Sequence, residues 1–175
     1  MREQDVDLSI IVAMTPNRVI GNAGKLPWIK LPSDLSRFRK ITVEAGVVIM
    51  GHKTFSSIIA RNGKPLPERK HIVLSRNNMF TTRRNVWFVC SLEEAVAEVG
   101  AHGGKACVIG GGEIFKLFLP LPQVKIAYIT TVYAQLLGDT YFPQLSGWDS
   151  VATSAIQKRD ERDEYETLWE IWKRR

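Results

Sequence analysis

Short apolar runs, each followed by a more polar segment, set the pattern of the first two thirds of the chain. Five runs contain almost no polar residue, and they cover residues 8–14, 47–50, 71–74, 86–89 and 106–109. Runs of this length and composition are typical of strands buried on both faces of a sheet. Because such burial requires helices on both sides, the pattern predicts an α/β fold.

Helices are expected in the segments between these runs. Pro32 suits the first position of a helix that continues to about residue 43. Ser91 and Glu94 have the spacing of a capping box, which begins a helix that residues 100–104 end. Shorter helices are expected at residues 55–59 and 113–119. This alternation favours parallel strands joined by right-handed crossovers.

The pattern changes after Pro122. Three strand-like segments follow without helices between them, at residues 124–132, 150–159 and 165–172, and the charged residues 160–164 join the last two. Strands joined in this way are antiparallel. We therefore expect an open mixed sheet of about eight strands, mostly parallel with an antiparallel C-terminal part and with helices on both faces.

The helix that begins at Pro32 directs a carboxylate toward its apolar face. Leu31, Leu35 and Phe38 recur at helical spacing, and Asp34 lies three residues after the first and four before the last. A helix that buries these side chains also turns the carboxylate inward, where it needs a partner. An acidic residue in a first turn can also serve the helix dipole alone, so this stretch leaves both interpretations open.

Length and composition indicate one globular unit. A chain of 175 residues with 45% hydrophobic content suffices for one domain, which we assign to residues 1–175, with residues 1–7 as a short polar extension. The beginning lacks a signal-peptide pattern and no run is long enough to span a membrane, so we expect a cytoplasmic protein. Cys90 and Cys107 lie in apolar runs, which indicates reduced, packed residues. Neither cysteines nor histidines have metal-ligand spacing, so no metal site is expected.

The formal net charge of +6 permits two kinds of partner. A basic surface attracts nucleic acid, and a basic cleft equally concentrates small polyanionic ligands. The aromatic residues do not alternate with Lys and Arg on an expected strand face, and no recognition motif is present. The sequence therefore favours small ligands over nucleic acid.

Candidate phosphate-binding residues gather where the parallel strands are expected to end. Gly110-Gly111-Gly112 follows the fifth run, Lys53-Thr54 the second and Ser75-Arg76 the third. Ligands of open α/β sheets bind beyond the carboxyl ends of the strands, and the amides of a helix start suit a phosphate. Two such sets fit a dinucleotide with an additional phosphate, which favours NADP over NAD. A simple tight turn and solvated surface cations are the alternatives.

Four further features each have a structural and a functional interpretation. Residues 15–25 form a glycine-containing loop beside a buried strand and are a candidate lid. Arg69, beyond a proline-rich segment, is either a surface arginine or a bidentate receptor for a carboxylate. Thr130 lies in an apolar run and needs a partner if buried, which an inward Asp34 would provide. Trp28 is either a core residue or part of a site.

Several segments, taken together in their order, make the chain similar to bacterial dihydrofolate reductases along essentially its whole length. The segments are Asn17-Arg18-Val19-Ile20-Gly21, Leu26-Pro27-Trp28, Leu31-Pro32-Ser33-Asp34-Leu35, Ile49-Met50-Gly51-His52-Lys53-Thr54-Phe55, Pro65-Leu66-Pro67-Glu68-Arg69-Lys70, Ile109-Gly110-Gly111-Gly112-Glu113-Ile114-Phe115 and Gly138-Asp139-Thr140-Tyr141-Phe142-Pro143. Each is a modest signal alone, whereas their joint order is highly specific. The resemblance implies NADPH-dependent reduction of 7,8-dihydrofolate to tetrahydrofolate.

The resemblance also implies a role for individual residues. Asp34 would bind the pterin and support its protonation, Thr130 would fix that carboxylate and Trp28 would hold a nearby water. The expected substrate-binding residues are Ile11, Val12, Asp34, Phe38, Ile58, Leu66, Arg69, Ile109 and Thr130. The expected NADPH-binding residues are Ala13, Ile20, Gly21, Lys53, Thr54, Leu74, Ser75, Arg76, Ile109, Gly111, Gly112, Glu113, Ile114 and Phe115. It further implies a cis peptide between Gly110 and Gly111, a monomer, and antifolates such as trimethoprim or methotrexate as ligands.

The chain departs from the family pattern at a few positions, none of which removes a catalytic group. Leu26 stands where many bacterial members have Met, and Phe115 where many have Tyr. Residues 29–30 and 59–64 lengthen two segments. A reductase of riboflavin synthesis resembles the same scaffold, but would not need Asp34 and Arg69 in these contexts. A basic nucleic-acid-binding domain is the alternative from a different class.

Overall fold

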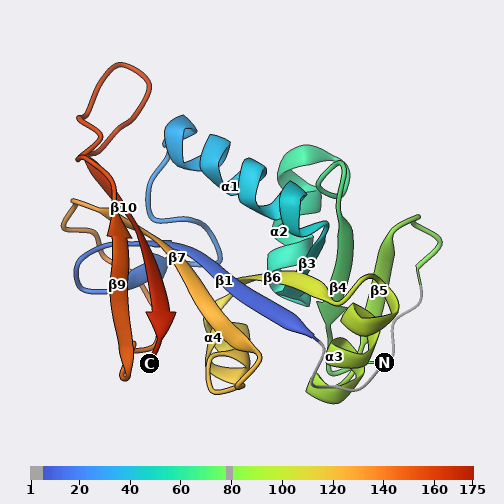
Figure 1. Ribbon diagram of the computed structural model, residues 1–175. Helices are drawn as coiled ribbons and strands as arrows, with labels where there is room; N and C mark the ends of the chain where they lie inside the picture. Colours follow the sequence, from blue (N-terminus) through green and yellow to red (C-terminus); the bar gives the residue numbers. More distant parts are fainter. Residues whose placement is uncertain (1–5, 78–80) are drawn as a thin grey trace.

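An eight-stranded sheet forms the centre of the computed structural model, which describes residues 6–77 and 81–175 (Figure 1). Its strands are β1 (Asp7–Met14), β3 (Val47–Gly51), β4 (Lys70–Leu74), β5 (Val86–Val89), β6 (Lys105–Gly110), β7 (Val124–Val132), β9 (Trp148–Thr153) and β10 (Thr167–Arg174). Their order across the sheet is β5-β4-β3-β6-β1-β7-β10-β9. A separate two-stranded sheet consists of β2 (Val19–Gly21) and β8 (Thr140–Tyr141).

The strand directions confirm the expected mixed sheet. All neighbours from β5 across to β7 pair in parallel, whereas β10 is antiparallel to both β7 and β9. Strand β1 lies between β6 and β7, so its carboxyl end is surrounded by other parallel strands. The bounds of β5 and β7 are those that the apolar runs predicted.

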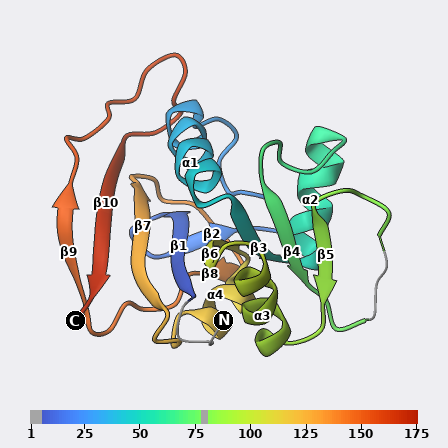
Figure 2. The same cartoon turned by 45° about the vertical axis from the view of Figure 1, so that its right-hand side comes forward.

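In the described parts of the chain, four helices cover the two faces of the sheet (Figures 1 and 2). They are α1 (Pro32–Ala45), α2 (His52–Asn62), α3 (Leu92–Ala101) and α4 (Gly112–Phe118). Pro32 begins α1 as expected, and α1 ends where Gly46 adopts a φ of 75°, which glycine accommodates without strain. The side chain of Ser91 accepts a hydrogen bond from the backbone N of Glu94, which confirms the predicted cap of α3.

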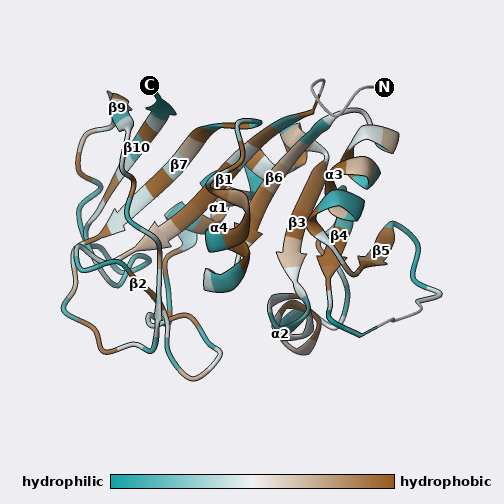
Figure 3. Cartoon of the chain, turned by 90° about the horizontal axis from the view of Figure 1, so that it is seen from below, coloured by the Kyte–Doolittle hydropathy of each residue, from teal (hydrophilic) through white to brown (hydrophobic). Residues whose placement is uncertain are grey.

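Two apolar layers hold α2, α3 and α4 to the sheet. The larger contains β1 and β6 together with side chains of α3 and α4, and the smaller contains Phe55 of α2 with Val48, Met50 and Val73. The central strands are predominantly hydrophobic along their length (Figure 3). Ile49 and Ile72 are completely buried, as expected for strands covered on both faces. Burial of this continuous surface is the main stabilising contribution to the fold.

Three expectations about the elements are wrong in detail. The predicted lid, residues 15–25, contains the short strand β2, which the apolar Val19-Ile20 only hinted at. The expected strand at residues 150–159 ends at Thr153, and residues 154–166 form a loop with a single bridge between Gln157 and Thr167. Helix α2 exceeds residues 55–59 at both ends. For β2 and β9, pairing with β8 and β10 decides the boundary.

The apolar face of α1 is less buried than its spacing predicts. Leu35 is 43% exposed, and Phe38 and Ile41 are half-buried, whereas Leu31 just before the helix is buried. Thr42 is the buried member of the helix itself. Part of this apolar face is therefore left uncovered by the chain's own side chains.

The structure also corrects two smaller expectations. Cys107 is buried, as expected, and burial raises the pKa of its thiol to about 12, whereas Cys90 is exposed rather than buried. The expected extension at residues 1–7 lies mostly outside the described residues. Its last two residues belong to the fold, because Val6 is buried and Asp7 begins β1. Within the described parts of the chain, no helix has the length and apolar character needed to cross a bilayer.

We predict that Gly138→Ala destabilises the β2–β8 pair. A β-carbon at Gly138 would collide with Cγ1 of Val19 and lie 2.6 Å from the backbone oxygen of Gly21. Overpacking of this kind costs about 1–3 kcal/mol in the free energy of unfolding. Urea unfolding measures this cost. The control Leu137→Ala, at a neighbouring side chain that is 89% exposed, is expected to stay within about 0.5 kcal/mol of the unchanged protein.

Candidate active site

The carboxyl group of Asp34 lies in the first turn of α1, against the carboxyl end of β7. Burial raises its pKa above the ordinary value, and this is the largest effect on the group. A hydrogen bond with the side chain of Thr130 and the positive charge of Arg37 oppose the rise, while the negative charge of Asp163 adds to it. The contact with Thr130 agrees with the inward orientation expected from the helix periodicity, and Asp34 as a whole residue is half-buried.

Thr130 reaches this position because of strand register. It pairs with Ala13 of β1 on one side and with Trp169 of β10 on the other, and it is 3% exposed. The buried hydroxyl needs a partner, and Asp34 provides one, as the sequence suggested. The interaction joins the start of α1 to the middle of the sheet.

Apolar residues from several elements surround the start of α1. Trp28 and Leu31 are buried with Val132, and the partly buried Ala13 packs against them. On β1 the preceding residues Ile11 and Val12 are also buried. Trp28 is thus part of an apolar cluster beside the first turn of α1.

The other expected substrate-wall residues share partial exposure. Each is apolar and half-buried although it belongs to a different element: Phe38 in α1, Ile58 in α2, Leu66 before β4, and Ile109 in β6. Apolar groups of this kind lose unfavourable contact with water when a ring covers them. Each of these four side chains therefore keeps apolar surface that a ligand could cover.

Arg69 is a buried guanidinium with fixed orientation. It is 5% exposed, so the interpretation as a surface arginine is wrong. Nε donates to the backbone oxygen of Pro67 at 2.8 Å and Nη1 donates to Oγ1 of Thr42 at 2.8 Å. Burial lowers its pKa from the ordinary value and nearby Arg39 adds to this, while Glu68 opposes it. The remaining N–H groups of the held guanidinium can bind a carboxylate.

His71 supports this region and was missed as a contributor by the sequence analysis. Its Nε2 accepts from the backbone N of Leu66 at 3.1 Å, and Nδ1 lies 3.2 Å from the backbone oxygen of Asn85. Burial lowers its pKa, which favours the neutral ring that can make both bonds. A histidine five residues after a proline-flanked leucine gave no sequence signal for this role.

The candidate anion-binding residues meet at one edge of the sheet. Register places Gly51 beside Leu74 and Met50 beside Gly110. The segments that follow these strands carry Lys53 and Thr54, and Ser75 and Arg76. Thr54 is near the glycine turn, because a β-carbon on Gly111 would lie 3.4 Å from its Oγ1. The strands that these residues follow therefore end side by side, as predicted, and Thr54 lies next to the glycine turn.

Close packing explains the glycines of the turn between β6 and α4. Gly110 has a φ of 109°, and a β-carbon there would lie 3.0 Å from the ring of Phe115. A β-carbon on Gly112 would lie 2.9 Å from Cγ2 of Thr140. The expected cis peptide between Gly110 and Gly111 is present. No side chain caps α4, so the amides of its first turn are available to an anionic group such as a pyrophosphate.

The remaining cofactor-binding candidates lie around this turn. Ile20 is buried, with its Cδ1 3.9 Å from a β-carbon placed on Gly112. The carbonyl of Gly21 accepts from the backbone N of Asp139 at 3.1 Å, and Asp139 Oδ2 accepts from the N of Ala23 at 2.9 Å. The candidate lid is thus tied to residues 138–142. Glu113 is exposed and Ile114 is half-buried against Gly51.

Surface shape alone does not indicate this site. One open pocket of about 410 Å³ lies beside α2 and β5. A second, of about 460 Å³, lies between α1 and Glu68. Neither is lined by Asp34. The site is recognised instead by a buried acid, half-covered apolar residues and uncapped amides near the carboxyl ends of the parallel strands.

We predict that Asp34→Asn stabilises the fold at neutral pH. The folded-state pKa of Asp34 is raised, so above that pKa the native state bears the cost of a buried charge, and the amide removes this cost. As pH falls toward the ordinary value of 3.8, the native acid takes up its proton and the advantage of the amide disappears. Urea unfolding across this pH range tests the sign. The prediction is contradicted if the difference in free energy of unfolding between variant and parent does not change with pH, or if it equals that of the exposed control Glu161→Gln.

Comparison with known proteins agrees with these features. Residues 7–174 match the family model described as "Dihydrofolate reductase". The dihydrofolate reductase of Haemophilus influenzae is 41% identical over 169 residues, covering 95% of this chain and 98% of that protein. The dihydrofolate reductase of Bacillus subtilis is 36% identical over 162 residues, covering 91% and 89% of the two chains.

A solved structure has the same fold. Dihydrofolate reductase from Enterococcus faecalis, complexed with NADP(H) and RAB-propyl, has a TM-score of 0.81 and 33% identity, with 96% of each chain covered. Matches of this extent to the family model and to the relatives show membership. The chain belongs to the dihydrofolate reductase family, the NADPH-dependent oxidoreductases that reduce 7,8-dihydrofolate to tetrahydrofolate.

Proposed function

We propose that Asp34 is the acid of this reductase and that its carboxyl group binds the pterin and supports its protonation. The observation that carries the proposal is the carboxyl group buried beside Thr130, whose pKa is raised by that burial. A raised pKa keeps a larger fraction of the group protonated near neutral pH, where an ordinary aspartate is ionised. NADPH supplies the hydride when it is bound.

The residues beside Asp34 hold it in a productive orientation. The hydroxyl of Thr130 fixes the carboxyl group, and Trp28 closes the apolar side of the site and is assigned a bound water. Exclusion of bulk water strengthens the polar contacts at the reacting ring. Alignment and protonation are therefore the two tasks of the protein near the pterin.

Binding of the rest of the substrate is assigned to apolar walls and one cation. Ile11 and Val12 would contact the pterin, while the half-buried Phe38, Ile58, Leu66 and Ile109 would enclose the rings. The guanidinium of Arg69 would bind the terminal carboxylate of the substrate. Its orientation by Pro67 and Thr42 supports this role, because a pre-oriented fork loses little freedom on binding.

NADPH binding is assigned to the glycine turn and the neighbouring strand ends. Ala13, Ile20, Gly21 and Ile109 would border the nicotinamide, and residues 111–115 with the uncapped start of α4 would bind the pyrophosphate. The adenosine half and its extra phosphate would contact Lys53, Thr54, Leu74, Ser75 and Arg76. The start of α4, which has no side-chain cap, supports the pyrophosphate assignment, because its first amides suit an anionic group.

Antifolates that imitate the pterin, such as trimethoprim or methotrexate, are proposed to bind the same acid. The Enterococcus faecalis relative binds RAB-propyl together with NADP(H), which supports this proposal. All the assigned groups come from one chain, so we further propose a monomer, acting in the cytoplasm.

A direct test mixes the protein with NADPH and dihydrofolate. The absorbance of NADPH is expected to fall with formation of tetrahydrofolate, and trimethoprim is expected to slow it. A protein that binds oligonucleotides in a salt-sensitive manner but leaves NADPH unchanged would contradict the proposal.

We predict that Asp34→Asn lowers the hydride-transfer rate by roughly a hundred- to ten-thousandfold near neutral pH, the range typical for loss of a general acid. NADPH is expected to bind the variant as it binds the parent protein, because the cofactor contacts lie elsewhere. Stopped-flow measurement of a single turnover and fluorescence titration with NADPH check the two parts. Unchanged turnover would refute the role of Asp34.

We predict that Arg76→Ala weakens NADPH binding far more than NADH binding. A hydrogen bond to a charged group contributes about 1.5–3 kcal/mol, so the loss for NADPH is roughly ten- to a hundredfold. The affinities of both cofactors are measured side by side. Arg61→Ala, which removes an exposed cation from α2, is the control. Equal losses of affinity for NADPH and NADH would contradict the assignment of Arg76 to the additional phosphate.

A further inference from the structure

The start of α1 is capped by a residue from a distant part of the chain. Leu31 occupies the cap position and provides no side-chain hydrogen bond to the helix. Instead, Oδ1 of Asp163 accepts from the backbone N of Ser33 at 3.0 Å, and Oδ2 accepts from the hydroxyl of Ser33. The first amides of a helix need such partners, and the positive end of the helix dipole stabilises a carboxylate there. Asp163 thus replaces the missing local cap.

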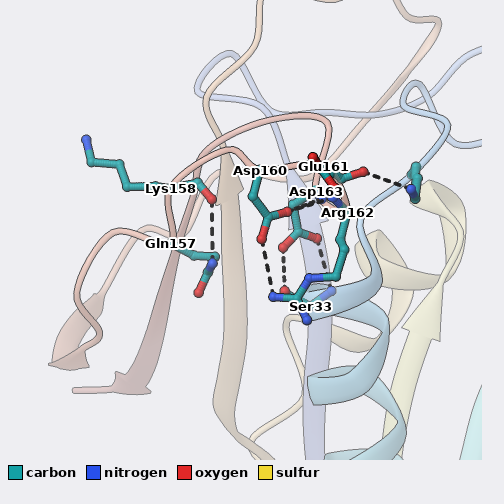
Figure 4. A network of polar contacts seen from close by, with 8 residues as sticks. Ser33, Gln157, Lys158, Asp160, Glu161, Arg162 and Asp163 are labelled. Carbon is teal, nitrogen blue, oxygen red and sulfur yellow. Dashed lines mark hydrogen bonds and ion pairs between the residues drawn. The ribbon is translucent and has the colours of Figure 1, made fainter.

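The loop between β9 and β10 holds Asp163 in this position (Figure 4). Oδ1 of Asp160 accepts from the backbone N of Arg162 at 2.8 Å and from that of Asp163 at 2.7 Å. The side chain of Arg162 donates to Oδ2 of Asp160 at 3.2 Å. Asp163 itself is only 1% exposed. A turn organised by its own hydrogen bonds therefore places a buried carboxylate against α1.

A second set of contacts fixes the segment that leads into α1. Oε2 of Glu164 accepts from the backbone N of Ile29 at 2.9 Å and of Lys30 at 3.3 Å. The backbone N of Glu164 donates to the oxygen of Lys30 at 3.0 Å, and Nζ of Lys30 donates to the backbone oxygen of Glu161 at 2.9 Å. The β9–β10 loop accordingly binds both the helix start and the residues before it.

We propose that Asp163 is a positioning residue for the reductase reaction: by capping α1 at Ser33, it fixes the first helical turn and with it the carboxyl group of Asp34. This inference rests on the proposed role of Asp34. Ser33 and Asp34 are consecutive, so movement of one backbone amide moves the other residue directly. A misplacement of about 1 Å at a reacting group can cost on the order of a hundredfold in rate.

The charge of Asp163 has a second consequence for the same group. The charged groups that act on Asp34 are Arg37 within α1 and Asp163 from the loop, and Thr130 of β7 adds a hydrogen bond. Repulsion by Asp163 raises the pKa of Asp34, in the same direction as burial. Removal of this charge with the cap retained should therefore lower the pH at which the rate begins to fall.

The experiment separates the cap from the charge with two variants of the full chain. Asp163→Asn keeps a good capping side chain but loses the charge, whereas Asp163→Ala loses both. Glu161→Gln is the matched control, since it removes the same charge from an exposed side chain of the same loop, and only its backbone oxygen contacts Lys30. Single-turnover rates from pH 5 to 9, kcat, KM for dihydrofolate and NADPH affinity are measured for each.

Asp163→Ala is expected to lower the single-turnover rate by roughly ten- to a hundredfold, with NADPH affinity unchanged. Asp163→Asn is expected to restore most of the rate at low pH and to shift the pH profile downward relative to Glu161→Gln. If Asp163→Ala does not fold, Ser33→Ala replaces it, because it removes one of the two capping bonds, and a loss of rate is again expected.

If Asp163 capped the helix but had no influence on the site, its removal would lower the melting temperature and leave the reaction rate unchanged. Unchanged rates per folded molecule, together with a profile of Asp163→Asn that coincides with that of Glu161→Gln, therefore overturn the inference. The role of Asp34 is judged separately by Asp34→Asn. Loss of activity in Asp34→Asn with no effect at Asp163 removes only the positioning role, whereas full activity in Asp34→Asn removes the proposed function itself.

Discussion

Burial of one carboxyl group at the start of α1 is the constraint to which the rest of the site relates. An ionised carboxylate in this position costs free energy, and the raised pKa of Asp34 reflects that cost. Protonation removes the charge, while the hydrogen bond with Thr130 and the positive charge of Arg37 stabilise the ionised form. The position can exist only because the sheet and the β9–β10 loop hold α1 from two sides. The same burial that opposes stability would serve the proposed chemistry, because an ordinary aspartate is ionised at neutral pH.

The parallel sheet contributes by bringing distant segments to one edge. Strands β3, β4 and β6 end side by side, so short segments after each of them present hydroxyls, cations and glycine backbone together. On the other side of β1, register places Thr130 beside Ala13, and its side chain interacts with Asp34 of α1. No single segment contains the site, which explains why each motif was ambiguous when taken alone and convincing only in combination.

Much of this could be predicted from the sequence, because the apolar runs and the helix spacing reflect burial directly. The strand pattern, the cap at Ser91 and the inward direction of Asp34 followed from local periodicity. What could not be predicted depends on long-range pairing. The β2–β8 pair, the end of β9 at Thr153 and the burial of Arg69 are decided by segments far away in the chain. The cap from Asp163 is of the same kind, because its sequence context is an ordinary charged turn.

The exposed apolar surface of α1 completes the account. Leu35 is exposed and Phe38 only half-buried although both lie on the apolar face of α1, and Ile58 of α2 and Leu66 before β4 are half-buried as well. Exposure of apolar surface to water costs free energy, and this cost is removed when a ligand ring covers the surface. Because this surface cannot anchor α1 fully, the helix needs other attachments. Polar contacts between Ser33 and Asp163 at its first turn provide them, and they lie one residue from Asp34, to which we assign the proton transfer.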